Sequence, residues 1–551
     1  MREAIEVVAS AVQLKTEDAA VGQVIENKRI IELPLNGRNI SALAVLTAGV
    51  QFGSQRSGES GTGGQIPGRM VAVSANGQRP VGSQITMDGV IITGSQNNMV
   101  AFTPSIDAVE EFKVQTSSYS AEYGQSSGAV VQIAMKGGSN QFHGTMFEFL
   151  RHDKLAAKDY FLNFQLPPGA SPLPANRLRR NQFGIFLSGP VYLPKIYDGK
   201  NKTFWSFNYE GERLTQESAQ ETFWYPQTFR NGDFSALLAP PIGSNGRPIR
   251  APVVIYDPLT GEPFRGADGQ ISNIIPASRI NRNAQNFINQ YQPLPLSSPA
   301  DPLQNNVRVS VPLIVRSNQY FWRIDHTFSP NDKIFVRWLG DREVSPQPAT
   351  NPYFPKTYTM KPSTWAAQWI HIISPRVLNE FRFGWYHSDE TDRSPRSNTA
   401  FDLDSLGIGR FRVVSQDNRK LTPLETGIPH FTGLSDVPGD RDNSEPGYAR
   451  ANQYEFDDNL AINRGNHNFK TGVELRRPTL DAGSSNDPRG IIGTSANIGG
   501  YAFAGFLMGY VNNTQTAEGL AYNEGRQNRW SAYFLDDWKA SRKLTVNYGL
   551  R

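Results

Sequence analysis

From about His143 onward, the chain alternates apolar and polar positions in segments of strand length. In residues 318–328 one set of alternate positions is apolar and the other polar: Tyr320, Trp322, Ile324 and Phe328 against Gln319, Arg323, Asp325 and Thr327. Because successive side chains of a strand point to opposite faces, this alternation predicts strands with one apolar and one wet face.

The same pattern recurs along the rest of the chain and predicts about eleven strands, each near the roughly 9 to 11 residues that a tilted strand needs to cross a bilayer. The predicted strands are residues 143–151, 181–192, 203–213, 318–328, 333–341, 365–373, 377–387, 452–462, 466–476, 528–538 and 543–551. Asp458 interrupts the apolar face of its strand, which would place it near a rim.

The connections between these strands are alternately short and long. Short ones fall at residues 197–199, 329–332, 374–376, 464–465 and 540–542, and long ones at residues 152–180, 214–317, 342–363, 388–451 and 478–527. Tight turns on one side and extended loops on the other are typical of a transmembrane β-barrel. The alternative is a soluble β-sandwich or propeller, which the long connections disfavour, since such loops are rare in compact soluble domains.

Composition narrows the class of protein further. Of 551 residues, 38% are hydrophobic and 11% aromatic, which suits strands with one face in lipid and one in water. No apolar run approaches the roughly 18 residues of a membrane-spanning helix. The absence of cysteine excludes disulfides and thiolate zinc sites. A net charge of +4, with no basic block, gives no sign of nucleic-acid binding.

Residues 1–142 have fewer aromatic and more small residues than the strand-rich part, and helix and strand signals mix there. We expect a separate α+β domain. Its predicted elements are a strand at residues 5–12, a short helix at 39–46, a hairpin at 85–92 that turns at Asp88-Gly89, and a strand at 129–134.

Several segments of this first domain resemble the plug domain of TonB-dependent outer-membrane receptors, and most of all their Oar-like branch. They are residues 33–39 (LPLNGRN), 76–79 (NGQR), 85–89 (ITMDG), 108–114 (AVEEFKV), 119–124 (YSAEYG), 128–131 (GAVV) and 136–140 (KGGSN). Residues 534–539 (FLDDWK) and 547–551 (NYGLR) resemble barrel strands of the same family.

The resemblance implies an α+β plug domain at residues 1–142, followed at residues 143–551 by the N-terminal half of an antiparallel transmembrane β-barrel, about 11 of about 22 strands. It implies a location in the bacterial outer membrane, among its lipids, and import of an unidentified ligand. The partner would be a TonB-type energy-transducing complex, acting on a missing N-terminal segment. Members of the Oar-like branch usually carry a carboxypeptidase-regulatory-like domain before the plug. No signal peptide is visible at residues 1–6, so either an N-terminal part is missing or the start is misplaced. Rival functions are an adhesion or assembly protein of the same form and a secreted β-rich binding protein.

Two groups of candidate site residues follow. The plug signature comprises Asn76, Gly77, Gln78, Arg79, Asp88 and Gly89, and we expect these residues to be structural rather than substrate ligands. The long connection 214–317 carries aromatic and arginine residues, types that commonly anchor ligands: Trp224, Tyr225, Tyr256 and Arg265. The alternative for this loop is that it packs on itself.

Catalytic chemistry is not indicated. The glycine-rich stretch 53–68 lacks the Gly-Lys-Ser/Thr ending of a phosphate loop, and we expect a plug loop there. No histidine pair has helical metal-ligand spacing. The neighbouring carboxylates Asp536-Asp537 and Asp457-Asp458 would point to opposite faces of their strands, one of each pair toward the lumen. We therefore expect no enzyme, no cofactor and no metal site.

Overall fold

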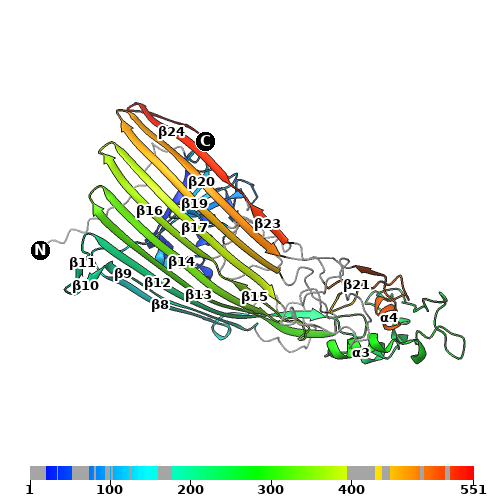
Figure 1. Cartoon of the computed structure of the whole chain (residues 1–551). Helices are drawn as coiled ribbons and strands as arrows, with labels where there is room; N and C mark the ends of the chain where they lie inside the picture. The colour runs from blue at the N-terminus through cyan, green and yellow to red at the C-terminus, as the bar shows by residue number, and fades with distance from the viewer. Residues whose placement is uncertain are drawn as a thin grey trace, which may run out of the picture.

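The computed structural model describes residues 20–33, 35–52, 73–79, 82–93, 100, 103–124, 126–158, 176–393, 428–436, 447–483, 489–515 and 522–551. The predicted strand at residues 5–12 and the glycine-rich stretch 53–68 lie outside these ranges. The described residues form a long tilted sheet, a small α+β domain against one face of it, and a loop subdomain beyond one end (Figure 1).

The long sheet is antiparallel and contains thirteen strands. The hydrogen-bonded order is β25-β24-β20-β19-β17-β15-β14-β13-β12-β9-β8. Strand β16, which is not in this order, pairs with the same two strands as β15, namely β14 and β17. Strand β23 pairs with β20, as β24 does. The strands are β8 His143–His152, β9 Leu178–Pro190, β12 Thr203–Thr222, β13 Val307–Ser329, β14 Asp332–Gln347, β15 Lys356–Met360, β16 Ser363–Ser374, β17 Val377–Arg393, β19 Gly447–Arg464, β20 His467–Gly483, β23 Tyr522–Arg526, β24 Arg529–Ser541 and β25 Leu544–Leu550.

Every predicted strand segment coincides with one of these strands, and the alternation of short and long connections is present as well. Several long connections were predicted too long. The largest error is at β12 and β13, which stay paired up to Thr222 and Val307, so the predicted loop 214–317 is only residues 223–306. The predicted loops 342–363 and 478–527 likewise contain the short strands β15 and β23. Residues 214–222 are mostly polar on both faces of the strand, which left no alternation to recognise. A small hairpin, β10 Tyr192–Leu193 and β11 Tyr197–Asp198, lies between β9 and β12.

Aromatic side chains line the outer face of the sheet. A row of directly paired residues crosses five neighbouring strands: Trp322, Trp338, Trp365, Trp385 and Tyr454. The rings of Trp322 and Trp365 meet edge to face at 5.3 Å. Asp458 lies on this outer face too, paired with Phe381 and Val473, and accepts a 2.7 Å hydrogen bond from Asn379. Asp458 therefore interrupts the apolar outer face, as the sequence pattern indicated.

The first domain is built on a five-stranded sheet of order β1-β6-β7-β4-β5, in which only the β4 and β7 neighbours are parallel. The predicted hairpin is confirmed, since Asp88 and Gly89 turn with φ of 49° and 81°. The predicted helix at residues 39–46 is a 3-10 helix. The elements are β1 Val21–Glu26, α1 Asn27–Glu32, 3-10 helices Asn36–Arg38, Ile40–Leu46 and Ile106–Ala108, and β2 Val50–Phe52, β3 Val73–Ala75, β4 Gln84–Met87, β5 Val90–Ile91, β6 Val109–Ser117 and β7 Val130–Met135.

The core of this domain extends into the long sheet. Side chains of the small α+β domain, which we call the plug, form one buried cluster with residues of the long sheet, which we call the wall. The plug members include Ile40, Phe112 and Ile133. The wall contributes Phe186, Phe321, Leu339, Tyr358, Met360 and Tyr386 to it. The lumen face is therefore not uniformly wet, because the wall supplies part of the apolar surface that the small domain buries.

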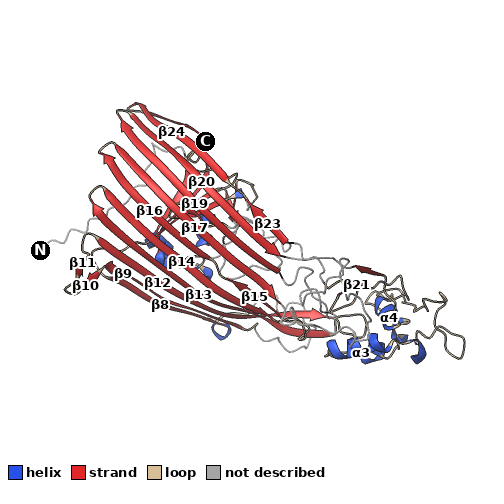
Figure 2. Cartoon of the chain, viewed as in Figure 1, coloured by secondary structure: helices blue, strands red, loops and turns tan. Residues whose placement is uncertain are grey.

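The loop subdomain gathers residues from three long connections around an aromatic core. Its helices lie at the end of the sheet opposite the short turns (Figure 2). Its elements are α2 Gln227–Arg230, 3-10 helices Ser235–Leu237 and Ala277–Arg279, α3 Arg282–Tyr291, α4 Ala502–Leu507, and a sheet of β18 His430–Thr432, β21 Ile491–Gly493 and β22 Asn513–Gln515. Within the described ranges, no helix is long and apolar enough to cross a membrane.

Candidate functional site

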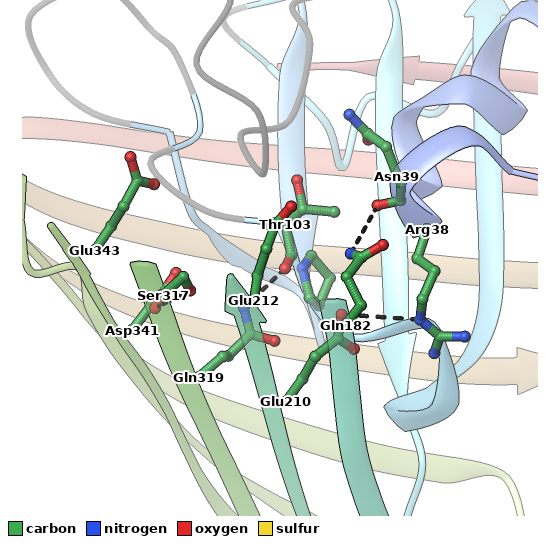
Figure 3. A pocket seen from close by; sticks show the side chains of 12 residues that line it. Arg38, Asn39, Thr103, Gln182, Glu210, Glu212, Ser317, Gln319, Asp341 and Glu343 are labelled. Atoms are coloured by element: carbon green, nitrogen blue, oxygen red, sulfur yellow. Dashed lines mark hydrogen bonds and ion pairs between the residues drawn. The ribbon is translucent and has the colours of Figure 1, made fainter. Parts of the chain in front are cut away.

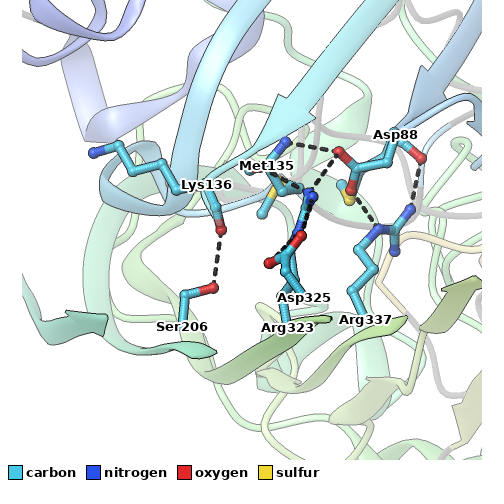
Figure 4. Close-up of polar contacts among 8 residues, drawn as sticks. Asp88, Met135, Lys136, Ser206, Arg323, Asp325 and Arg337 are labelled. Carbon is cyan, nitrogen blue, oxygen red and sulfur yellow. Dashed lines mark hydrogen bonds and ion pairs between the residues drawn. The ribbon is translucent and has the colours of Figure 1, made fainter. Parts of the chain in front are cut away.

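Asp88, at the tip of the β4-β5 hairpin, holds the plug to the wall (Figure 4). Its Oδ2 lies 2.6 Å from Nε of Arg337 on β14, whose Nη2 also donates to the Met87 carbonyl at 2.6 Å. Oδ1 accepts from the Met135 amide at 2.9 Å. With side-chain exposures of 6% and 0%, this ion pair is shielded from water. A buried pair is costly to break on one side, because the remaining charge loses its partner.

A second arginine extends the contact. Arg323 on β13 donates from Nη1 to the Met135 carbonyl at 3.1 Å and lies 3.6 Å from Asp88. Its own strand supplies Asp325, 2.7 Å from Nη2. Nearby, Ser206 donates to the carbonyl of Lys136, and burial lowers the pKa of the Lys136 amine while the carboxylates of Asp107 and Glu110 oppose that shift. The end of β7 is thus fixed to two wall strands.

A further charged contact lies beside the same hairpin. Arg382 on β17 faces Glu122 of the plug at 3.6 Å, and Glu455 on β19 accepts from the Ile91 amide at 3.2 Å. Gly89 allows this close approach, since its φ is positive and a Cβ there would overlap Arg382. The positive φ favours glycine here, and a larger residue would also require the Arg382 side chain to shift.

An acidic cavity of about 40 Å³ separates another part of the plug from the wall (Figure 3). Arg38 of the plug pairs with Asp107 and lies 3.8 Å from Glu210. Gln319 of the wall accepts from the Ser105 amide and donates to the Thr103 carbonyl, at 2.9 and 2.8 Å. The wall side of the cavity carries the carboxylates Glu210, Glu212, Asp341 and Glu343. Plug and wall therefore meet through polar contacts that water could replace.

The remaining plug signature residues shape a turn. Asn76 and Gly77 follow β3 with φ of 51° and 76°, and the side-chain amide of Asn76 donates from Nδ2 to the Thr116 carbonyl at 3.0 Å. Gln78 closes the turn through its backbone, and Arg79 is exposed, with its carbonyl accepting from Gly82. The contacts of Asn76, Gly77, Gln78 and Arg79 are thus local, and the structural role of the group stays a prediction.

The loop candidates divide into two pairs. Trp224 and Tyr225 are 4% and 2% exposed; Tyr225 stacks on Phe503 at 3.7 Å, and Trp224 donates to Asp436. A ligand-facing position does not fit this burial. Tyr225 belongs to the aromatic core of the loop subdomain, and Trp224 is tied to Asp436, as in the alternative in which the loop packs on itself. Tyr256, 40% exposed, and Arg265 remain at the surface, so ligand contact by these two stays a prediction.

Sequence reasoning missed one buried arginine of the loop subdomain. Arg230 donates to the carbonyls of Tyr225, Ile288, Gln292 and Pro293 and to the Gln292 side chain, at 2.7 to 3.4 Å. Burial lowers its pKa to about 10, which still leaves it charged at neutral pH. No local pattern marks this residue, because all its acceptors except the Tyr225 carbonyl lie about sixty positions away along the chain.

Residues 134–551 match the family model described as an outer membrane beta-barrel domain. The chain belongs to that family, and it is located in the bacterial outer membrane. Over 162 residues it is 28% identical to the TonB-dependent transporter Oar of Myxococcus xanthus, a match that covers 29% of this chain and 15% of that protein. The predicted resemblance to TonB-dependent outer-membrane receptors is thereby confirmed.

A solved structure shares the fold. The outer membrane transporter YddB from Escherichia coli superposes with a TM-score of 0.54 at 11% identity, covering 96% of this chain and 56% of that one. The siderophore receptor PirA from Acinetobacter baumannii gives 0.46 at 13% identity, covering 96% and 56%. The chain thus spans little more than half the length of these proteins. The relatives are transporters and receptors rather than enzymes.

Proposed function

We propose that the protein is an energy-coupled receptor that takes up a ligand through the outer membrane. The observation that carries this proposal is the plug held in the wall by a shielded ion pair, Asp88 with Arg337. A plug of this kind blocks the route past the wall until it moves. We assign residues 1–142 to the plug and 143–551 to the wall, since the plug sheet ends at Met135 and β8 begins at His143.

In the proposed mechanism, the outer loop subdomain captures the ligand, with Tyr256 and Arg265 among the contacts. A TonB-type complex then pulls on a segment that precedes the plug. Ion pairs suit such a release, because water that enters a slightly opened contact hydrates both charges and lowers the cost of further separation. The acidic cavity around Glu210 offers a place where water could first enter.

Uptake in living cells tests the proposal. A strain that lacks the full-length protein would be grown on candidate nutrients, with uptake measured in the deletion strain, the complemented strain and a complemented strain without an active TonB-type complex. We expect growth on one nutrient class to need both the receptor and the complex. Equal uptake without the complex would contradict energy coupling, whereas loss of cell adhesion alone would favour the rival adhesion function, which the relatives do not favour.

A further inference from the structure

The loop subdomain contains a pocket of about 290 Å³ that none of the predicted site residues lines. Helices α3 and α4 and the short sheet of β18, β21 and β22 surround it. Its lining comprises Asn281, Asn283, Ala284, Phe287, Phe431, Ile492, Phe506, Gly509, Val511 and Thr514. The pocket lies at the end of the wall opposite the short turns, which is the cell exterior in barrels of this kind.

Three aromatic rings form the base of the pocket. Phe431 lies 4.8 Å from Phe287 and 5.6 Å from Phe506, measured between ring centroids, in the tilted and edge-to-face arrangements that aromatic groups prefer. The rings come from three separate chain segments, and each is almost fully buried. Packing therefore fixes their positions before any ligand arrives.

The mouth of the pocket is open and partly polar. Val511 is 38% exposed, and Asn283 and Thr514 are exposed beside it. Gly509 shapes the edge, since its φ is +84° and a Cβ would lie 2.7 Å from the Asn281 amide. Asn281 itself caps α3 by accepting from the amides of Asn283 and Ala284.

Charge and size together define the occupant. The lining carries no formal charge, so a charged group would lose its hydration there without gaining a partner. An engineered apolar cavity of about 150 Å³ holds one benzene ring. A pocket of about twice that volume with an aromatic base fits two fused rings.

We propose that this pocket binds a neutral fused-ring aromatic group, and that it is the outer capture site for that part of the ligand. The second half of this statement rests on the proposed function, whereas binding itself does not. Contact with the ring edges of Phe431 and Phe506, which reach the pocket over the buried Phe287, supplies the attraction. The Thr514 hydroxyl offers a hydrogen-bond partner to a polar edge such as an indole N–H.

Binding of 5-fluoroindole to the full-length protein in lipid nanodiscs, followed by fluorine NMR, tests the inference. We expect saturable binding to the wild type. Val511→Asp places a carboxylate at the mouth and should weaken binding by at least about tenfold, which corresponds to about 1.4 kcal/mol. Ala284→Trp fills the pocket and should abolish binding.

Ile271→Asp is the matched control, because Ile271 is 37% exposed in the same subdomain and does not line the pocket. Its affinity should stay within about twofold of the wild type. Absence of saturable binding, or equal affinities of V511D and I271D, would overturn the inference. V511D keeps the test decisive if A284W fails to fold. If fluoroindole binds but no energy-dependent uptake is found, the proposed function is contradicted and the pocket is not. If energy-dependent uptake is found but fluoroindole does not bind, the pocket is contradicted and the proposed function is not.

Discussion

At the scale of single residues, one aspartate links the two parts of the molecule. Asp88 adopts a positive φ that suits few residues besides glycine, asparagine and aspartate, and its carboxylate pairs directly with Arg337 of the wall. The sequence supports the turn, because Asp-Gly is a strong hairpin signal. The partner arginine, 249 positions further along the chain, has no such local signal.

Asp88→Asn should loosen the plug. The variant keeps the turn but leaves the Arg337 guanidinium buried without its counter-charge, which typically costs about 3 to 5 kcal/mol. Limited proteolysis of the purified protein should cut the plug faster while the wall stays resistant. Glu111→Gln, at an exposed carboxylate on β6, serves as control and should change nothing. If Asp88→Asn/Arg337→Met recovered no resistance, the buried charge would not be the cause.

Arg230→Met should unfold the loop subdomain and leave the wall intact. The substitution removes the donors for a set of buried oxygens, and each unmatched acceptor costs about 1 to 3 kcal/mol. Hydrogen exchange should show lost protection in α3, whose C-terminal carbonyls Arg230 contacts. Arg265→Met, at an exposed arginine of the same loop, is the comparison. Unchanged protection in α3 would show that the arginine is not the anchor.

At the scale of elements, alternation of side chains located eleven of the thirteen wall strands, because lipid on one side and lumen on the other impose it. The short strands β15 and β23 lie within connections that were predicted to be loops. Alternation failed as a strand signal where lipid and lumen no longer impose it. Residues 214–222 continue β12 with a mostly polar sequence, and only the pairing with β13 reveals them as strand. The core of the loop subdomain was not predicted, for a related reason. Tyr225 and Phe503 stack on each other although almost three hundred residues separate them in the sequence, and no local periodicity indicates such a core.

The outer face of β14 gives a test at this scale. Val336 lies between Ile324 and Ala367 on the lipid-facing side, so Val336→Arg should destabilise the sheet by up to about 2 to 4 kcal/mol. The midpoint of urea unfolding in lipid vesicles measures the change. Ser218→Arg, on the polar extension of β12, should shift the midpoint little. Similar shifts for the two variants would argue against lipid contact at Val336.

At the scale of the whole molecule, plug and wall meet over charged contacts and over shared apolar surface. The sequence predicted the plug and the wall as consecutive domains. It could not show which wall residues face the plug, because Phe321 and Leu339 appear only as exceptions on a polar face. Contacts between distant segments depend on the register between strands and on the curvature of the sheet, which the sequence of a single strand does not determine.

A disulfide between plug and wall would test whether uptake needs the plug to move. The chain has no cysteine, so Val90→Cys with Gly384→Cys gives a single possible bridge. A Cβ on Gly384 would lie 3.1 Å from the Val90 Cβ, a few tenths of an ångström short of the usual range for disulfides. We expect oxidation to stop uptake and a reductant to restore it. Uptake that continued with the bridge intact would mean that the ligand passes a stationary plug.

The shared core has a consequence for how the protein is made. Phe321 and Leu339 belong to wall strands yet are fully buried beneath the plug, where they complete its apolar cluster. A plug that reached the periplasm ahead of its wall would expose that surface, and exposed apolar surface of this kind invites aggregation. We therefore expect the plug to acquire its final packing only when it docks on the wall, so that the wall acts as a folding template for the domain packed against it.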